Sequence, residues 1–105
     1  MPKKKTIEPQ AQPSQEASWT FLTNHAHVLI CLSRNSEMVL RDVAVMVGIT
    51  ERAVQRIIGE LEQGGYLERI KEGRRNTYRL ILEKPLRHPI EKNHSVAELV
   101  GLMIH

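Results

Sequence analysis

The stretch VGITERAVQRIIGELEQGGYL, residues 47–67, decides the fold of this chain of 105 residues. Within it, Thr50 is a suitable N-cap, because its hydroxyl oxygen accepts a hydrogen bond from a free N–H of the first helical turn. Apolar side chains then recur at the spacing of one helix face, at Val54, Ile57, Ile58 and Leu61. Gly48 before this run and Gly64-Gly65 after it mark the two ends. The stretch therefore predicts an amphipathic helix over 51–63.

Two shorter apolar runs precede this helix. The first predicts a helix with Thr23 as its N-cap and Ser33 near its end. The second predicts a brief helix over 41–47, after a short extended piece at 38–40. The expected inward faces are Ala26, Leu29, Ile30 and Ser33 in the first helix, and Leu40, Val43, Ala44 and Val47 in the second. Gly48 ends the second helix, and two helices joined by a tight glycine turn form a helix-turn-helix.

The residues that follow predict a β-hairpin and one more helix. Residues 66–71 and 76–82 read as strands, joined by a glycine-containing tip at 72–75. Two prolines then interrupt the chain before Ser95, which we expect to cap a last helix. The apolar stripe of that helix consists of Val96, Leu99, Val100 and Met103. This order of elements predicts a mainly α chain with a small β-hairpin wing, which is an α+β winged helix-turn-helix.

The outer face of the third predicted helix carries charged and polar side chains. A rotation of about 100° per residue from the inward residue Val54 places Arg52 and Arg56 on the opposite side, with Gln55 on the flank. Arginine forms paired hydrogen bonds with guanine and glutamine does so with adenine. These residues lie in the first two turns, the part of a recognition helix that enters the major groove. We therefore predict DNA contacts by Thr50, Arg52, Gln55 and Arg56; the alternative is a solvated charged face.

The predicted hairpin and the second helix add basic groups. Lys71, Arg74, Arg75 and Arg79 cluster around the hairpin tip, where Glu72 is the only acidic residue beside them. Arginine at a hairpin tip contacts phosphate or enters a narrow minor groove. Arg41 begins the second helix, where free N–H groups also favour phosphate. We predict that the DNA contacts of the wing and of the phosphate backbone come from Arg41, Lys71, Arg74, Arg75 and Asn76. The alternative is that the charges at the hairpin tip only keep the hairpin soluble.

Other features exclude whole classes of function. The single cysteine, Cys31, allows neither an intrachain disulfide nor a cysteine-rich zinc site. The five histidines contain no pair spaced i, i+4, so we predict no metal and no cofactor. No P-loop, GxGxxG motif, nucleophile elbow or paired acids are present, so we predict no enzyme activity. The apolar runs are too short to span a bilayer and a secretory signal is absent, which predicts a cytoplasmic protein that contacts no membrane.

The composition divides the chain into three parts. Residues 1–18 are rich in proline, glutamine and lysine without apolar periodicity, which predicts a disordered N-terminal tail. Residues 19–84 form the predicted winged helix-turn-helix DNA-binding domain. Residues 85–105 form a linker and a helix whose stripe packs either on its own domain or on a second copy. We favour the second copy, because a domain this small gains most from added apolar burial.

The motif residues resemble those of a known family. The run 47–58, continued through Leu61 and residues 64–67, is similar to winged-helix bacterial and archaeal transcriptional regulators, most to the MarR group and next to the ArsR group. Residues 73–78 resemble their wing, and residues 26–29 resemble their preceding helix. The resemblance implies a homodimer on a pseudo-palindromic operator. Groove contacts then fall on Arg52, Gln55 and Arg56, and wing contacts on Arg74 and Arg75.

The chain departs from both groups in ways that bear on its ligands. MarR proteins have long terminal helices that dimerise and frame an effector pocket, whereas this sequence predicts one modest C-terminal helix. ArsR metal sensors use cysteine pairs, which are absent here. The sequence leaves a small-molecule effector open.

Three functions are consistent with this sequence. The first is a sequence-specific DNA-binding transcriptional regulator acting on double-stranded DNA. The second is a winged-helix protein–protein interaction module without specific DNA binding, because a fold does not fix its function. The third is an RNA-binding wing domain, which would place aromatic residues on its binding surface. The arginine pattern on the third helix favours the first.

Overall fold

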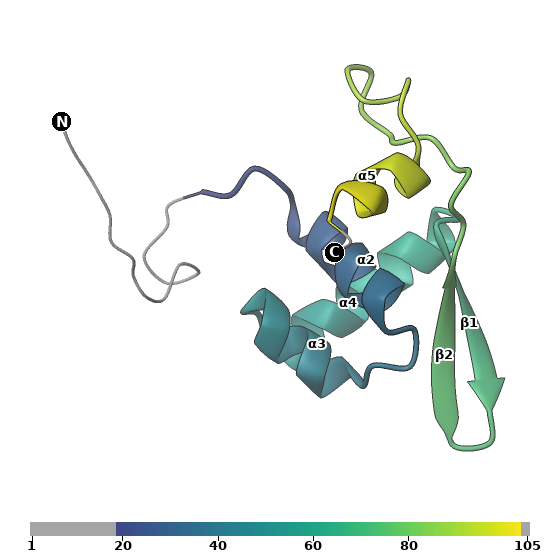
Figure 1. Ribbon diagram of the computed structural model, residues 1–105. Coiled ribbons are helices and arrows are strands. Elements are labelled where there is room, and N and C mark those ends of the chain that lie inside the picture. The colour runs from purple at the N-terminus through teal and green to yellow at the C-terminus, as the bar shows by residue number, and fades with distance from the viewer. Residues whose placement is uncertain (1–18, 104–105) are drawn as a thin grey trace, which may run out of the picture.

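The computed structural model describes residues 19–103, and the predicted disordered tail at 1–18 lies outside them. Within the described residues, four helices and one hairpin follow one another along the chain (Figure 1). They are α2 (Asn24–Arg34), α3 (Leu40–Val47), α4 (Glu51–Gln63), β1 (Leu67–Glu72), β2 (Arg75–Leu80) and α5 (Val96–Leu102). The arrangement confirms the predicted α+β winged helix-turn-helix.

Local capping fixes where the three helices of the motif begin and end. The Thr50 hydroxyl accepts a hydrogen bond from the Ala53 N–H at 3.0 Å, and Thr23 caps α2 in the same way. Gly48 ends α3 in the left-handed conformation, with φ of 86°. The second helix begins earlier than predicted: Leu40 is helical rather than extended, because Val39 takes the N-cap position and its carbonyl accepts the first helical hydrogen bonds.

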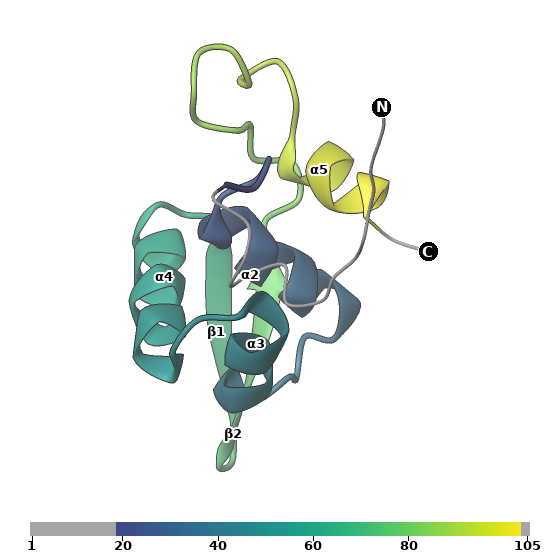
Figure 2. The same cartoon turned by 90° about the vertical axis from the view of Figure 1, so that its left-hand side faces the viewer.

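Helix α2 lies in the middle of the molecule, with α3 below it, α5 above it and the hairpin to one side (Figures 1 and 2). A helix that is surrounded in this way buries more than one face. Its buried side chains accordingly go beyond the predicted stripe and include Val28, Cys31 and Leu32, whereas Ser33 is only half-buried. Burial raises the pKa of the Cys31 thiol, which keeps it protonated.

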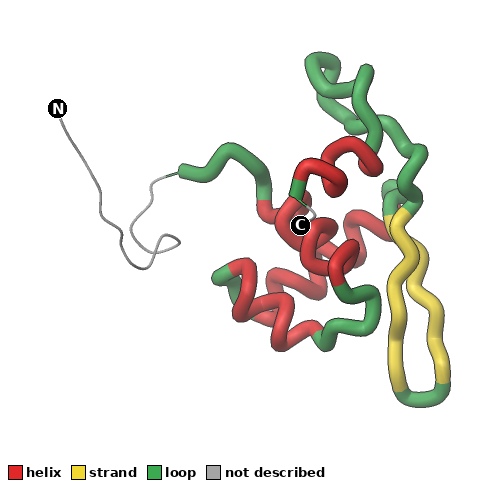
Figure 3. Tube along the Cα trace, viewed as in Figure 1, coloured by secondary structure: helices red, strands yellow, loops and turns green. Residues whose placement is uncertain are grey.

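The hairpin is antiparallel and projects past the helices (Figure 3). Its register pairs Leu67 with Leu80 and Glu72 with Arg75, so the loop is a two-residue turn rather than the predicted four-residue tip. Gly73 opens this turn with φ of 64°, a conformation that glycine adopts without strain. The first strand begins one residue later than predicted, because the Tyr66 N–H is bonded to the last turn of α4.

The C-terminal helix α5 packs against α2 of the same chain. Ser95 and Glu98 form a capping box at its start, in which each side chain accepts a hydrogen bond from the other residue's N–H. Val96 and Val100 are buried in the core, so part of the predicted stripe is covered within the protomer. The predicted dimer role of this helix stays a prediction. No helix in the described part of the chain is long and apolar enough to cross a membrane.

Candidate nucleic-acid interface

Helix α4 separates its apolar and cationic side chains as the sequence predicted. Val54, Ile57, Ile58 and Leu61 are all buried in the core. Arg52, Gln55 and Arg56 are exposed, and so is the capping residue Thr50. The four predicted residues thus lie together at the start of α4, on or beside its solvent side, where the helix also presents the positive end of its dipole.

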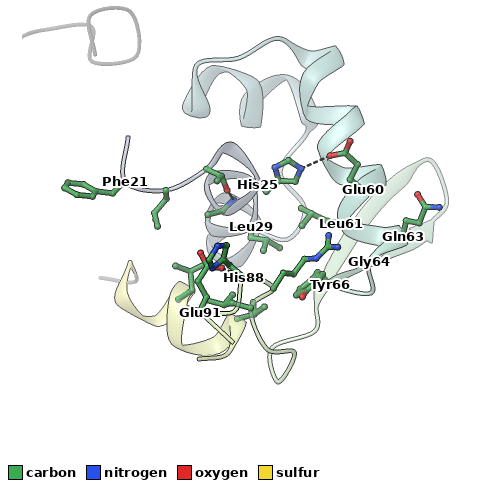
Figure 4. A pocket seen from close by; sticks show the side chains of 17 residues that line it. Phe21, His25, Leu29, Glu60, Leu61, Gln63, Gly64, Tyr66, His88 and Glu91 are labelled. Carbon is green, nitrogen blue, oxygen red and sulfur yellow. Dashed lines mark hydrogen bonds and ion pairs between the residues drawn. The ribbon is translucent and has the colours of Figure 1, made fainter. Parts of the chain in front are cut away.

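Arg56 contacts Glu60, which in turn contacts His25, and the sequence analysis selected neither of these residues. Its Nη1 lies 3.4 Å from Oε2 of Glu60, one turn further along α4. The other carboxylate oxygen, Oε1, lies 2.6 Å from Nε2 of His25 on α2 (Figure 4). The hydrogen bond with His25, helped by the nearby Arg56 charge, holds the pKa of Glu60 below its ordinary range. The i, i+4 spacing of Arg56 and Glu60 was a readable signal. The link to His25, 35 positions away, left none.

The wing is less basic in effect than its sequence suggested. Arg75 pairs with Glu37 from the loop between α2 and α3, with Nη2 2.9 Å from Oε1, and Arg79 pairs with Glu68 on the facing strand. The expectation that Glu72 alone opposes the basic cluster is therefore wrong. Strand pairing places Glu68 beside Arg79, and the fold brings the 36–37 segment alongside β2.

The remaining predicted cations keep their charge uncompensated. In the region 19–103, Arg41, Arg52, Lys71 and Arg74 form no ion pair. All four are exposed. Arg74 occupies the hairpin turn, while Lys71 lies opposite the half-buried Asn76 in the register. The exposed cations thus come from α3, from α4 and from the wing that projects past the helices.

A groove with a volume of about 910 Å³ lies between α2, the C-terminal half of α4 and the segment 86–99 (Figure 4). Leucines and other apolar side chains form most of its wall, and His25 and Glu60 are among the residues that line it. Of the described residues, no three histidine, cysteine, aspartate or glutamate side chains gather into a metal site. His88 instead accepts the Ile90 N–H through Nδ1, and His94 contacts Glu98.

The class that the fold defines is the winged helix-turn-helix, since the glycine turn joins α3 to α4 and the hairpin follows directly. Residues 23–68 match the family model for winged helix-turn-helix DNA-binding domains. The match runs from the N-cap of α2 into β1 and so includes every predicted contact on α3 and α4. No curated protein matches the chain.

Proposed function

We propose that this protein is a sequence-specific transcriptional regulator that binds double-stranded DNA, with α4 in the major groove and the β1–β2 wing beside it. The observation that carries the proposal is the two-sided character of α4. Its aliphatic side is buried in the core, while Arg52, Gln55 and Arg56 remain exposed in the first two turns. The similarity of residues 23–68 to DNA-binding domains supports the same conclusion.

Each side chain receives a role from its chemistry. Arg52 and Arg56 pair with guanine through O6 and N7, and Gln55 pairs with adenine. Thr50 caps α4 first and contacts a phosphate second, because its hydroxyl already accepts the Ala53 N–H.

The wing and α3 supply the backbone contacts. Arg74 and Lys71 reach phosphate or the minor groove from the hairpin, with Asn76 as a neutral donor. Arg41 contacts phosphate from the first turn of α3. Arg75 shares its guanidinium between Glu37 and DNA, since a guanidinium has five N–H donors.

The proposal includes a homodimer of the MarR type. Each protomer would read one half-site of a pseudo-palindromic operator, with half-site centres about 10 bp apart, one turn of DNA. The groove beside α5 gives a small-molecule effector room, but the resemblance alone names none.

The test begins with selection of bound sequences from a random duplex pool. Fluorescence anisotropy then compares the selected duplex with a random duplex at low and moderate salt. We expect Arg56→Ala to weaken binding of the selected duplex by about 1–3 kcal/mol and to relax preference at one base pair. Arg74→Ala should weaken both duplexes alike and reduce the salt dependence by about one charge. Unchanged selectivity in Arg56→Ala would reject the recognition-helix assignment.

One observation favours the second candidate, a protein-interaction module. Val39, Val45 and Met46 are exposed apolar side chains at and within α3, with Val45 75% exposed. Such side chains suit a protein partner if they form a continuous patch. In that case the same titration should give weak binding at moderate salt, without preference between the selected and the random duplex.

A further inference from the structure

The contacts of Arg56 extend the proposed function, and the inference drawn from them rests on it. Arg56 is the predicted base-reading residue nearest the middle of α4, and a flexible arginine side chain loses rotamer entropy when it binds a base edge. A residue that holds the guanidinium beforehand reduces this loss and improves recognition. Glu60 is placed to act in this way, because its carboxylate lies against Nη1 of Arg56.

We propose that Glu60 is a positioning residue for Arg56, and that His25 holds Glu60 in place. The contacts from Glu60 engage Nη1 of Arg56 at 3.4 and 3.5 Å. The Nη2 and Nε donors have no partner among the described residues and remain for O6 and N7 of guanine. One guanidinium therefore bonds to the carboxylate and to the base at the same time.

His25 makes the arrangement more than an exposed pair on one helix. Pairs of this kind are worth little when both partners move freely. Here the Nε2–H of His25 donates to Oε1 of Glu60. His25 lies on α2, a helix that is held in place by its buried side chains. The carboxylate is thus fixed between two elements, and its lowered pKa keeps it ionised and able to accept from both partners. Because Arg56 contacts this fixed carboxylate, its guanidinium is restricted to fewer positions.

A second glutamate on the same helix supplies the matched control. Glu62 also lies in the last turns of α4, but its carboxylate pairs with Arg69 of β1 at 3.0 Å rather than with a predicted base-reading residue. Replacing either glutamate by glutamine removes one negative charge near the DNA. Only Glu60→Gln also removes the support of Arg56.

The experiment measures the affinity of full-length variants for the selected duplex and for a random duplex by anisotropy. For Glu60→Gln we expect about three- to tenfold weaker binding of the selected duplex, because the support of a paired base contact is lost. Binding of the random duplex should tighten about twofold, because a charge that repels phosphate is gone. For Glu62→Gln both affinities should rise by the same factor. Equal changes of both duplexes in both variants would overturn the inference.

His25 gives an independent second route. His25→Ala should weaken the selected duplex about threefold and leave the random duplex within about twofold, because Glu60 keeps its charge but loses its anchor. His25→Gln retains a donor and should restore much of the selectivity. The double variant with His25→Ala and Glu60→Gln should bind the selected duplex no worse than Glu60→Gln alone. Additive losses would reject the coupling between His25 and Glu60.

The outcomes also separate this inference from the proposed function. A wild-type protein that does not prefer its selected duplex over the random one defeats both. A wild-type protein that does prefer it, combined with the same selectivity in Glu60→Gln, His25→Ala and wild type, defeats only the positioning role. Thermal unfolding of each variant, followed by circular dichroism, shows that folded proteins are compared.

Discussion

Gly59 leaves a gap in the side chains of α4 between Arg56 and Gln63. A Cβ atom added at this position would meet no other atom within 4 Å, so packing within the protein does not require glycine. Glycine in a helix interior costs about 1 kcal/mol relative to alanine. A stability cost without a packing reason fits a surface that another backbone approaches closely.

We expect Gly59→Ala to stabilise the folded protein by about 1 kcal/mol while weakening DNA binding. The added methyl group would stand between α4 and the floor of the major groove. Thermal unfolding and anisotropy with the selected duplex measure the two effects. Gly101→Ala in α5, where a Cβ also meets nothing within 4 Å, serves as the control and should leave DNA binding unchanged. A Gly59→Ala protein that binds DNA as the wild type does contradicts the expectation.

At the scale of elements, the wing is attached to the helices on two sides. The Tyr78 N–H donates to the Ser36 carbonyl at 3.0 Å, which joins β2 to the loop between α2 and α3. Arg75 and Glu37 continue this attachment toward the hairpin turn. On the other strand, β1 follows α4 after a short turn in which the Tyr66 N–H donates to the Leu61 carbonyl at 2.8 Å. The wing therefore keeps a defined direction although most of its side chains are exposed.

Loss of the Glu37 carboxylate should loosen the outer half of the wing. We expect Glu37→Gln to speed hydrogen exchange of the amides near the hairpin turn, with little change in the free energy of unfolding, because exposed ion pairs are worth at most about 1 kcal/mol. Hydrogen exchange followed by mass spectrometry measures this. Glu68→Gln is the matched control, since it removes an ion pair within the hairpin and leaves the attachment to the helices intact. Equal exchange in the two variants counts against the attachment.

The capping box of α5 makes a contribution to the folding stability that depends on pH. The Ser95 N–H, followed by the His94 side chain, holds the pKa of Glu98 below its ordinary value of 4.5. A carboxyl group with a lowered folded-state pKa stabilises the fold above its unfolded pKa, and the contribution is lost as the pH falls through the folded value.

We therefore expect Glu98→Gln to reduce the loss of stability on acidification below about pH 4.5, as measured by urea unfolding at pH 7 and between pH 3 and 4. Ser95→Ala, which removes the cap itself, should cost about 1 kcal/mol at neutral pH. Glu83→Gln, an exposed glutamate in a turn, is the charge-matched control. An equal loss of unfolding free energy on acidification in Glu98→Gln and in the wild type would exclude a contribution from the capping box.

At the scale of the whole molecule, α5 is part of the core that α2 organises. Val96 is fully buried and Val100 is 4% exposed, while Leu102 on the same helix is 71% exposed. The Arg34 guanidinium donates to the Met103 carbonyl at 3.0 Å and so holds the end of α5 against the end of α2. One side of the helix stabilises the protomer, and the other remains open to a second copy.

These two sides predict different dependence on protein concentration. We expect Val100→Ala to lower the melting temperature by the same amount at every concentration, because the cavity it leaves lies inside one protomer. Leu102→Ala should leave the melting temperature of the dilute protein unchanged and weaken the proposed homodimer, as sedimentation would show. Concentration-dependent destabilisation by Val100→Ala would mean that the buried face belongs to the dimer.

The sequence predicted those features that depend on neighbouring residues. The caps at Thr50 and Ser95, the glycine turn at Gly48 and the inward face of α4 all follow from local hydrogen bonds and helical spacing. It did not predict the pair of His25 and Glu60, because this contact joins distant positions that no periodicity relates. The tertiary fold alone brings such groups together, and for that reason the contacts of Glu60 with His25 and of Arg75 with Glu37 emerged only with the structure.

The attachment of β2 to the α2–α3 loop has one more consequence. Because the hairpin is held on one side by that loop and on the other by the turn that joins it to α4, the protein itself sets the spacing between α4 and the wing. The wing and α4 then keep a fixed separation. If α4 and the wing bind DNA as proposed, we expect duplexes whose groove width already fits this spacing to be deformed least on binding. The intrinsic shape of a site would then contribute to its selection even at base pairs that no side chain touches.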